Sequence, residues 1–373
     1  MWRFQREMKE DKGARWFELE CVPKEYIFPK EYRPQNLDSP VCDSIPVISL
    51  AKSKAENGHS QPVEEILKAS QELGFFQVIN HGIPEKTVTD AMNVLKEFFD
   101  MQAKDTTTVT VPHKKGYIYT NSTYFAKDGV HLWRENVKHP CHPLEECIHL
   151  WPASPTRYQE VIAAYMVEIQ KLSTRILEMI CEGLGLEQGY FKDTSEVQFL
   201  SSNFYPPCPD PSLTLGLLPH IDPSLITILY QGGSTGLQVM KDGQWVNVGA
   251  IPNAFVVNIG NQLEIISNWK FKSAKHQVVT STYETRLSIA TFVNPSPNWI
   301  IEPAKNLVNE LEPTLYKASQ NMVNELELTL YKATQNMVNV LEPALYKPIQ
   351  YKDYLLHSNA FGDDTAALQN GLR

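Results

Sequence analysis

The sequence lacks long apolar runs, basic clusters and closely spaced cysteine pairs. No stretch of its 373 residues approaches the roughly 18 consecutive apolar residues that a membrane-spanning helix needs, and its first residues hold no apolar leader segment. We therefore expect no membrane association and a cytoplasmic location. No run of lysine and arginine is long enough to follow a phosphate backbone, and the formal net charge is −9, so we expect no nucleic-acid partner.

The few cysteines give no metal or disulfide pattern. Neither a CxxC pair nor the spacing of a zinc site occurs, which in a chain without a leader indicates reduced, structural thiols. They are Cys21, Cys42, Cys141, Cys147, Cys181 and Cys208. The composition is 42% hydrophobic and 21% charged, which is ordinary for a globular protein and excludes disorder throughout. The length allows one or two domains.

The first half of the chain alternates between strand-like and helix-like patterns. Residues 45–50 and 75–80 are rich in β-branched and aromatic residues, as buried strands are. Residues 63–73, 84–101 and 155–187 carry apolar residues at helical spacing, so we expect these helices to cover one face of a sheet.

From Val197 to Val293 the chain changes to short β-rich runs separated by Gly, Pro, Asn and Asp. This texture is typical of a sandwich or jelly roll. The expected runs are 197–205, 225–230, 236–240, 244–248, 254–259, 263–266, 277–281 and 286–293.

Three near-copies of one unit follow, starting at residues 306, 321 and 336 and therefore spaced 15 residues apart. At about 100° per residue this step turns an apolar stripe by about 60° from copy to copy, which disfavours a coiled coil. Pro313 and Pro343 indicate broken helical pieces. We expect a C-terminal helical insertion without a chemical role; a small solenoid or a partner surface is the alternative.

Two histidines and an aspartate form a candidate metal site. His220 and Asp222 are two residues apart, so on a strand both side chains leave the same face. His276, in a later β-like run, is the best third ligand. Two imidazoles and one carboxylate make a facial triad that leaves coordination positions open, as in non-haem iron(II) oxygenases. An HxD pair alone is weak evidence, so the neighbouring motifs decide its interpretation.

A second motif suits a diacid. Arg286 and Ser288 are also two residues apart, and a guanidinium beside a hydroxyl can bind a carboxylate through charge-assisted hydrogen bonds. One end of such a diacid would lie on the metal and the other on Arg286. Asn203 and Tyr205, which share a face before a proline turn, are candidates for further contacts to it.

These motifs occur in a recognisable order. An NxYPPCP motif begins at Asn203, the HxD pair follows at His220, then comes the distal His276, and an RxS motif begins at Arg286. In this order they resemble the plant 2-oxoglutarate and iron(II)-dependent dioxygenases of specialised metabolism, in particular the hyoscyamine 6-dioxygenase-like enzymes. Residues 74–82 (GFFQVINHG) also match that family.

The resemblance covers about residues 20–305 and resumes near 341–355. It implies a mainly β fold with flanking helices, built on a distorted double-stranded β-helix, or jelly roll. The regions we expect are an N-terminal α/β region of the non-haem dioxygenase type at 1–150, a helix plus the jelly-roll core at 151–305, the three repeats at 306–350, and a C-terminal segment and tail at 351–373.

The resemblance also implies roles for individual residues. It assigns iron(II) to the three candidate ligands: His220, Asp222 and His276. It assigns the far carboxylate of 2-oxoglutarate to Arg286, Ser288 and Tyr205. Asn203 is a further candidate contact. It also implies molecular oxygen as the second cosubstrate and ascorbate as a compound that supports activity. We expect a small-molecule substrate and a monomer.

Four positions qualify the resemblance. The family often has Asp at the position of Asn261, Gly at that of Trp269 and Arg at that of Gln277. None of these departures removes a ligand, although Trp269 is expected to reshape a turn near the site. His81 lies in a matching segment without a ligand role, and we interpret it as part of a structural turn.

Substrate contacts follow less directly from the sequence. Phe292 shares a strand face with Ser288, and we name it with three tyrosines of the loop-rich region as candidates: Tyr117, Tyr119 and Tyr124. Aromatic walls suit an alkaloid, phenylpropanoid or terpenoid, and hydroxylation is the favoured reaction. Desaturation, epoxidation and demethylation use the same cofactors. A non-catalytic binding protein with a relict iron site, and a zinc hydrolase on a cupin-like barrel, are the other classes considered.

Overall fold

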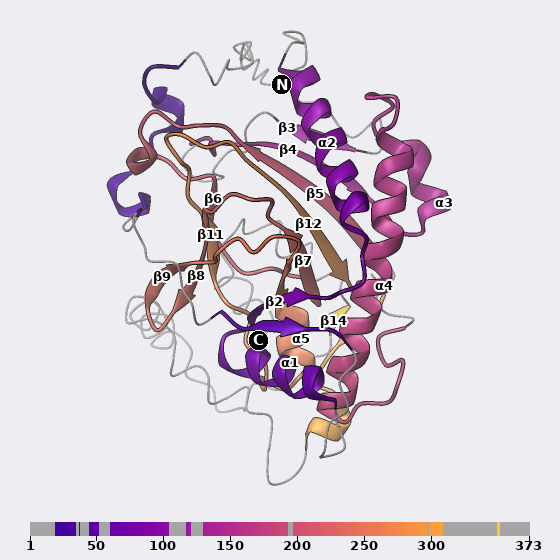
Figure 1. Cartoon of the computed structure of the whole chain (residues 1–373). Helices are drawn as coiled ribbons and strands as arrows, with labels where there is room; N and C mark the ends of the chain where they lie inside the picture. Colours follow the sequence, from indigo (N-terminus) through magenta and orange to yellow (C-terminus); the bar gives the residue numbers. More distant parts are fainter. Residues whose placement is uncertain are drawn as a thin grey trace, which may run out of the picture.

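Two β-sheets and three long helices make up most of the described structure (Figure 1). The computed structural model describes these residues: 19–34, 37, 45–51, 60–103, 117–120, 130–192, 197–296, 298–308 and 349–350. None of the helices in these ranges is both long and apolar enough to cross a membrane.

The large sheet has eight strands and the small sheet has four. In spatial order the large sheet contains β1 (Val47–Ser49), β2 (Phe75–Ile79), β10 (Phe255–Ile259), β7 (Ile226–Tyr230), β12 (Arg286–Asn294), β5 (Val197–Tyr205), β4 (Glu135–Pro140) and β3 (Ile118–Thr120). The small sheet contains β6 (Leu217–His220), β11 (His276–Val278), β8 (Leu237–Lys241) and β9 (Gln244–Asn247). All pairings within them are antiparallel except that of β1 with β2.

Three helices cover the outer face of the large sheet. They are α1 (Gln61–Glu72), α2 (Glu85–Gln102) and α4 (Tyr158–Leu184), and Figure 1 shows α2 and α4 running alongside the long strands. The apolar stripe of α4, which includes Ile162, Ile169 and Ile176, is fully buried in the main hydrophobic core. Gly185 ends α4 with φ +66°, a conformation that costs glycine little.

Side-chain alternation gives the large sheet two different faces. Outward residues such as Ile228, Val257 and Ile289 join the core under the helices. Their neighbours one residue away face the small sheet, and a second core between the sheets includes Phe75 and Val239. The interior polar residues described below lie on this inner face, so the register of the sheet determines which side chains reach the candidate site.

Shorter elements complete the described chain. The helices are α3 (Leu144–Cys147) and α5 (Asn261–Ile266), and the 3₁₀ turns are η2 (Lys24–Tyr26), η3 (Lys30–Tyr32), η4 (Ile148–Leu150), η5 (Pro211–Leu213) and η6 (Lys305–Leu307). A small two-stranded sheet joins β13 (Ile300–Ile301) to β14 (Ile349–Gln350).

The β-rich texture of residues 197–293 is confirmed, but the expected runs did not include β6, and one of them is a helix. Residues 263–266, expected as a strand, belong to α5. The hydrophobic pattern of a short apolar run cannot distinguish a buried helix from a buried strand. This ambiguity applies to α5 because all of its residues are buried. The C-terminal helical insertion predicted for the repeats and the tail at 351–373 lie outside the described residues, apart from residues 306–308 and β14.

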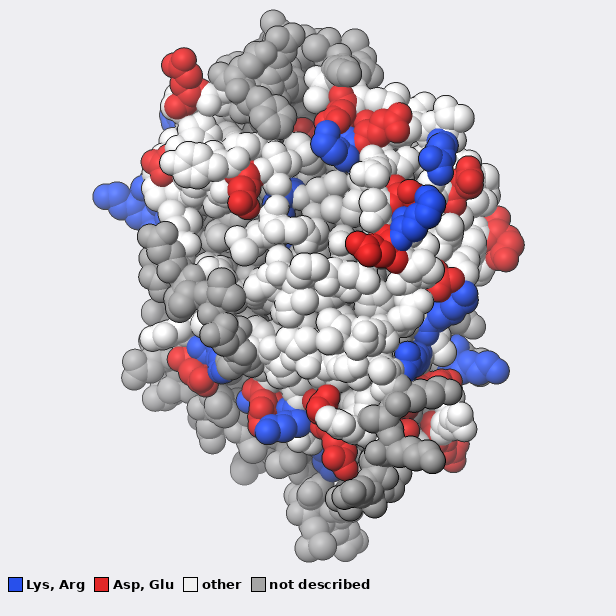
Figure 2. Space-filling model, viewed as in Figure 1, with Lys and Arg blue, Asp and Glu red and all other residues white. Residues whose placement is uncertain are grey.

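Charged side chains on the face shown in Figure 2 have both signs interspersed around its edges, and a broad uncharged area crosses its middle. The lysines and arginines among the described residues form no continuous stripe on this face.

Candidate metal centre

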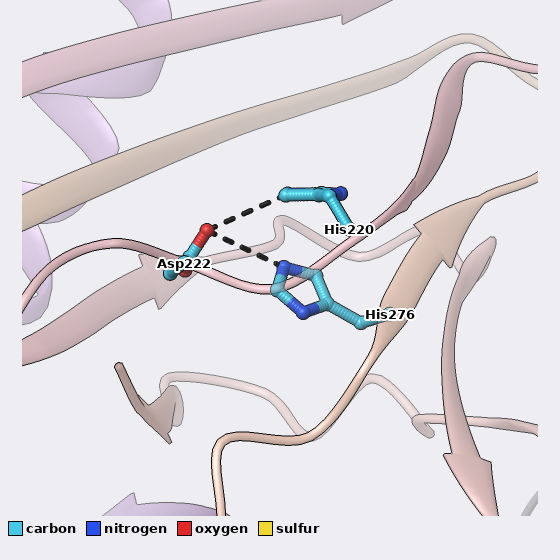
Figure 3. A group of neighbouring side chains, drawn as sticks. All are labelled: His220, Asp222 and His276. Carbon is cyan, nitrogen blue, oxygen red and sulfur yellow. Dashed lines mark ion pairs between the residues drawn. The ribbon is translucent and has the colours of Figure 1, made fainter. Parts of the chain in front are cut away.

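The small sheet brings the two histidines together. β6 and β11 pair antiparallel with His220 directly opposite His276, and Asp222 follows β6 by two residues. The ring centroids of the two histidines are 4.2 Å apart. Asp222 Oδ1 lies 3.4 Å from His220 Nε2 and 3.7 Å from His276 Nε2, so all three side chains converge on one point (Figure 3).

Backbone contacts orient both imidazoles for metal binding. His220 Nδ1 is 2.8 Å from the Leu218 carbonyl oxygen, and His276 Nδ1 is 3.1 Å from that of Ala274. A carbonyl only accepts hydrogen bonds, so each Nδ1 carries the proton and each Nε2 keeps its lone pair. This arrangement fixes the tautomer that a metal ligand needs.

Asp222 is held by two donors on its far oxygen. Its Oδ2 accepts hydrogen bonds from Thr227 Oγ1 at 2.6 Å and from Asn258 Nδ2 at 2.8 Å. Thr227 on β7 and Asn258 on β10 are register partners on the inner face. Oδ1 is thereby turned toward the histidines, as a monodentate metal ligand requires.

Burial and neighbouring groups set the charges of the triad. Burial alone would raise the pKa of Asp222, but His276, His220 and the Thr227 hydroxyl outweigh it and lower this pKa well below its usual range. Burial, followed by the effect of His220, lowers the pKa of His276 to about 4. At neutral pH the site therefore offers a carboxylate and a neutral imidazole, the forms that bind metal.

The donor set fits a divalent iron. The ligand atoms of His220, Asp222 and His276 all lie within 4.8 Å of one another. Among the described residues, these three form the group of His, Cys, Asp or Glu side chains that could hold a metal ion. Asp222 and His276 are buried, whereas the His220 side chain is 19% exposed and opens the site to solvent on one side. Two imidazoles and one carboxylate on neighbouring strands form the facial arrangement expected from the sequence.

A buried arginine lies at the end of the inner face. Arg286 is 4% exposed and is the register partner of Tyr205, whose ring centroid lies 5.2 Å from its guanidinium carbon. Nη1 donates a hydrogen bond to Ser288 Oγ at 3.0 Å, while the buried Nε and Nη2 have no hydrogen-bond partner among the described residues. Buried donors without partners are rare and costly, and a ligand carboxylate would satisfy both.

Asn203 is near this arginine but is already engaged. It is the register partner of Ser288, and its Oδ1 accepts hydrogen bonds from Arg134 at 2.9 Å and Asn136 at 3.0 Å. Asn136 of β4 and Arg134, the residue directly before that strand, orient its side chain.

The aromatic candidates for the substrate fall into different places. Phe292 is half-buried on the inner face, as register partner of Thr227. Tyr119 lies on the outer face of β3, where its hydroxyl donates to Glu135 Oε2 at 2.7 Å in the main core. Tyr117 also packs against that core. Tyr124 lies outside the described residues.

The sequence analysis did not identify the two residues that donate hydrogen bonds to Asp222. Thr227 and Asn258 each interrupt an otherwise apolar strand, in ITILY and FVVNI. A polar side chain in a strand that is buried on both faces needs a hydrogen-bond partner, and that signal could have identified both.

The remaining sequence predictions for this region concern turns. His81 Nδ1 accepts from the Ile83 amide, so Nε2 donates to the Asn253 carbonyl, which confirms the structural turn. Trp269 has φ +64°, a left-handed conformation that suits the glycine expected there. Gln277 donates to Gln238 at 2.8 Å within the small sheet.

Family models match two parts of the chain. The model of the 2OG-Fe(II) oxygenase superfamily matches residues 196–295, and that of the non-haem dioxygenase in morphine synthesis N-terminal region matches residues 45–154. The first match contains all three candidate ligands and Arg286.

Curated relatives match over most of their length. The chain is 41% identical over 310 residues to hyoscyamine 6-dioxygenase of Hyoscyamus niger, covering 79% of this chain and 88% of the relative. It is 37% identical over 304 residues to flavanone 3-dioxygenase 2 of Oryza sativa subsp. japonica, covering 80% and 87%.

A solved structure agrees in fold. The crystal structure of JOX2 in complex with 2OG, Fe and JA has a TM-score of 0.70 and 32% identity, covering 91% of this chain and 90% of that one. The two sheets are thus those of the double-stranded β-helix core of this group. With its His-Asp-His triad in place, the chain belongs to the 2OG-Fe(II) oxygenase superfamily and is a 2-oxoglutarate- and iron(II)-dependent dioxygenase.

Proposed function

We propose that this dioxygenase hydroxylates a small specialised metabolite, such as an alkaloid, phenylpropanoid or terpenoid. The observation that carries the proposal is the combination of the triad with a half-buried aromatic side chain beside it. Phe292 is the register partner of Thr227, which itself binds the Asp222 carboxylate. Register partners lie about 5 Å apart, so an apolar substrate resting on Phe292 is close to the metal position. The activities in the names of the curated relatives support this class of substrate.

We assign the far carboxylate of 2-oxoglutarate to Arg286. Its Nε and Nη2 would donate to the two carboxylate oxygens, and Ser288, held by Nη1, would add its hydroxyl. The Tyr205 ring lies against the guanidinium and limits its movement. Asn203 would act indirectly, because its Oδ1 is held by β4 and its neighbour.

Iron(II) and 2-oxoglutarate, when bound, supply the oxidation of the substrate by molecular oxygen, with succinate and carbon dioxide as coproducts. The chain contributes position and surroundings. His220, Asp222 and His276 would hold the metal, and the side chains of the inner face would surround the substrate. Thr227 and Asn258 keep the carboxylate from rotating.

Incubation with iron(II), ascorbate, 2-oxoglutarate and a metabolite panel tests the proposal. Succinate and substrate mass are read together, with His276→Ala as the inactive control and Lys68→Met, on the exposed side of α1, as the matched active control. A gain of one oxygen atom in step with succinate supports hydroxylation. Loss of two hydrogens indicates desaturation instead, and turnover that needs neither oxygen nor 2-oxoglutarate would refute the assignment.

The organisation of the chain follows from the same proposal. Strands from both sides of residue 150 pair in the large sheet, since β4 pairs with β5. We therefore propose that regions 1–150 and 151–305 build one catalytic unit, to which 306–350 and 351–373 are additions. We also propose that the enzyme acts as a cytoplasmic monomer.

A further inference from the structure

Lys138 is a cationic side chain on the inner face of the large sheet. Its register partner on β5 is Ser201, which in turn faces Ala290 of β12. The next inward-facing pair along these strands is Phe199 and Phe292. Lys138 therefore shares its face with Phe292, the register partner of Thr227, and it comes from a strand that the candidate metal site does not use.

The side chain of Lys138 extends over these two rings. Its Nζ lies 5.4 Å from the ring centroid of Phe199 and 5.7 Å from that of Phe292, within cation–π range. The ammonium thus extends from β4 past β5 to β12, and β12 is the neighbour of the strand that holds Thr227. Lys138 is exposed and both phenyl rings are half-buried, so this part of the inner face is open to solvent.

The positive charge of Lys138 has no protein counterion among the described residues. No carboxylate there forms an ion pair or hydrogen bond with Nζ, whose contacts are the two rings. Lys138 reaches solvent, but the protein atoms around it exclude part of its water; this desolvation and the nearby Arg134 lower the pKa of Lys138, and Asp222 partly offsets the change. The charges of iron(II), the 2-oxoglutarate dianion, Asp222 and Arg286 balance one another. The Lys138 ammonium therefore remains a positive charge without a counterion among the described residues, on the face that carries Phe292.

We propose that Lys138 is a specificity-determining residue that binds an anionic group of the substrate, with a carboxylate as the simplest such group. Phe199 and Phe292 hold the apolar body of the substrate between that anion and the metal. This inference rests on the proposed function and narrows it to acids whose oxidised carbon lies several bonds from the carboxylate. A charge-assisted contact of this kind changes affinity by about tenfold to a hundredfold.

Matched probes separate charge from shape. The probes are 3-phenylpropanoate, 4-phenylbutanoate and 3-cyclohexylpropanoate, each with its amide and its amine counterpart. Binding is measured as the shift in melting temperature of the full chain loaded with iron(II) and 2-oxoglutarate without oxygen. The variants are Lys138→Met, which keeps the apolar stem, Lys138→Arg, which keeps the charge, and Lys138→Glu, which reverses it.

We expect the wild type and Lys138→Arg to bind the acids at least about tenfold more tightly than the amides, and Lys138→Met to show less than about a twofold difference. Lys138→Glu should prefer the amines. Lys68→Met should behave like the wild type. Equal binding of acids and amides by the wild type, absence of any response to the acids, or an unchanged preference in Lys138→Met would each overturn the inference.

The failure of the proposed function would look different. Substrate-independent succinate formation with iron(II), 2-oxoglutarate and oxygen tests the dioxygenase chemistry and does not involve Lys138. If that reaction were absent while the acid preference depended on Lys138, the proposed function would fail and the anion site would stand. If succinate formed normally and no acid preference existed, only the anion site would fail.

Discussion

Replacing Arg286 by methionine should abolish the binding of 2-oxoglutarate without destabilising the ligand-free protein. Arg286 is buried, and its Nε and Nη2 have no hydrogen-bond partner in the described part of the chain, so the ligand-free fold already bears the cost of two unsatisfied donors on a buried cation. Methionine of similar volume removes that cost, and we expect a free energy of unfolding within about 1 kcal/mol of the wild type, or above it.

The loss of ligand binding should be large. Truncating one partner of a buried, hydrogen-bonded charge pair costs about 2–5 kcal/mol, which corresponds to about 30-fold to several thousandfold in affinity. At a 2-oxoglutarate concentration of about 100 times the dissociation constant, the ligand stabilises the wild type by about 2.7 kcal/mol. A hundredfold weaker variant at the same concentration gains only about 0.4 kcal/mol.

Thermal unfolding with iron(II), without oxygen and across a series of 2-oxoglutarate concentrations, measures both quantities. Ser288→Ala is the graded control, since it removes one hydroxyl and should cost about 1 kcal/mol of ligand binding. Retention of the full 2-oxoglutarate shift in Arg286→Met would refute the assignment of the carboxylate to this residue. A ligand-free variant that unfolds much more easily would refute the claim that the guanidinium is unpaired.

Three further changes test other parts of the structure. Asn258→Ala removes a hydrogen bond to Asp222 Oδ2 and should weaken iron(II) affinity about 10- to 100-fold in an anaerobic titration, while an unchanged affinity would show that Thr227 alone orients the carboxylate. Trp269→Gly relieves a left-handed conformation and should raise the free energy of unfolding in urea by about 1 kcal/mol; a fall would mean that the indole packing outweighs the strain. Burial lowers the pKa of His139 to about 4, below its usual value near 6.5, so the folded state disfavours its protonation and stability falls as pH drops from about 6.5 to 4. His139→Gln should flatten this part of the stability profile in denaturation at a series of pH values, because His276 titrates equally in both proteins.

Much of the site could be predicted because its chemistry follows strand alternation. His220 with Asp222, and Arg286 with Ser288, are pairs two residues apart, and such pairs share a face whatever the neighbouring strands do. The pairing of His220 with His276 was not available from spacing, because strand order in a sheet depends on contacts far apart in sequence. His276 was chosen as the third ligand because it lies in a later β-like run, and the resemblance to a family then supported that choice.

Other features depended on three-dimensional packing. Tyr119 was a candidate for the substrate, yet the register of β3 against β4 turns it toward the main core. The strand expected at 263–266 is the helix α5, since its apolar residues are buried on all sides and period alone does not distinguish the two. Lys138 had no distinguishing motif, and only its placement above Phe199 and Phe292 draws attention to it.

The central claim is that His220, Asp222 and His276 together hold one iron(II) with positions left for 2-oxoglutarate. Anaerobic addition of iron(II) and 2-oxoglutarate to the metal-free protein, followed by visible absorption, tests it directly. We predict a weak charge-transfer band that saturates at one iron per chain and is absent from His276→Ala. A wild-type protein that binds both components without the band, or a His276→Ala variant that keeps it at full strength, would contradict this claim.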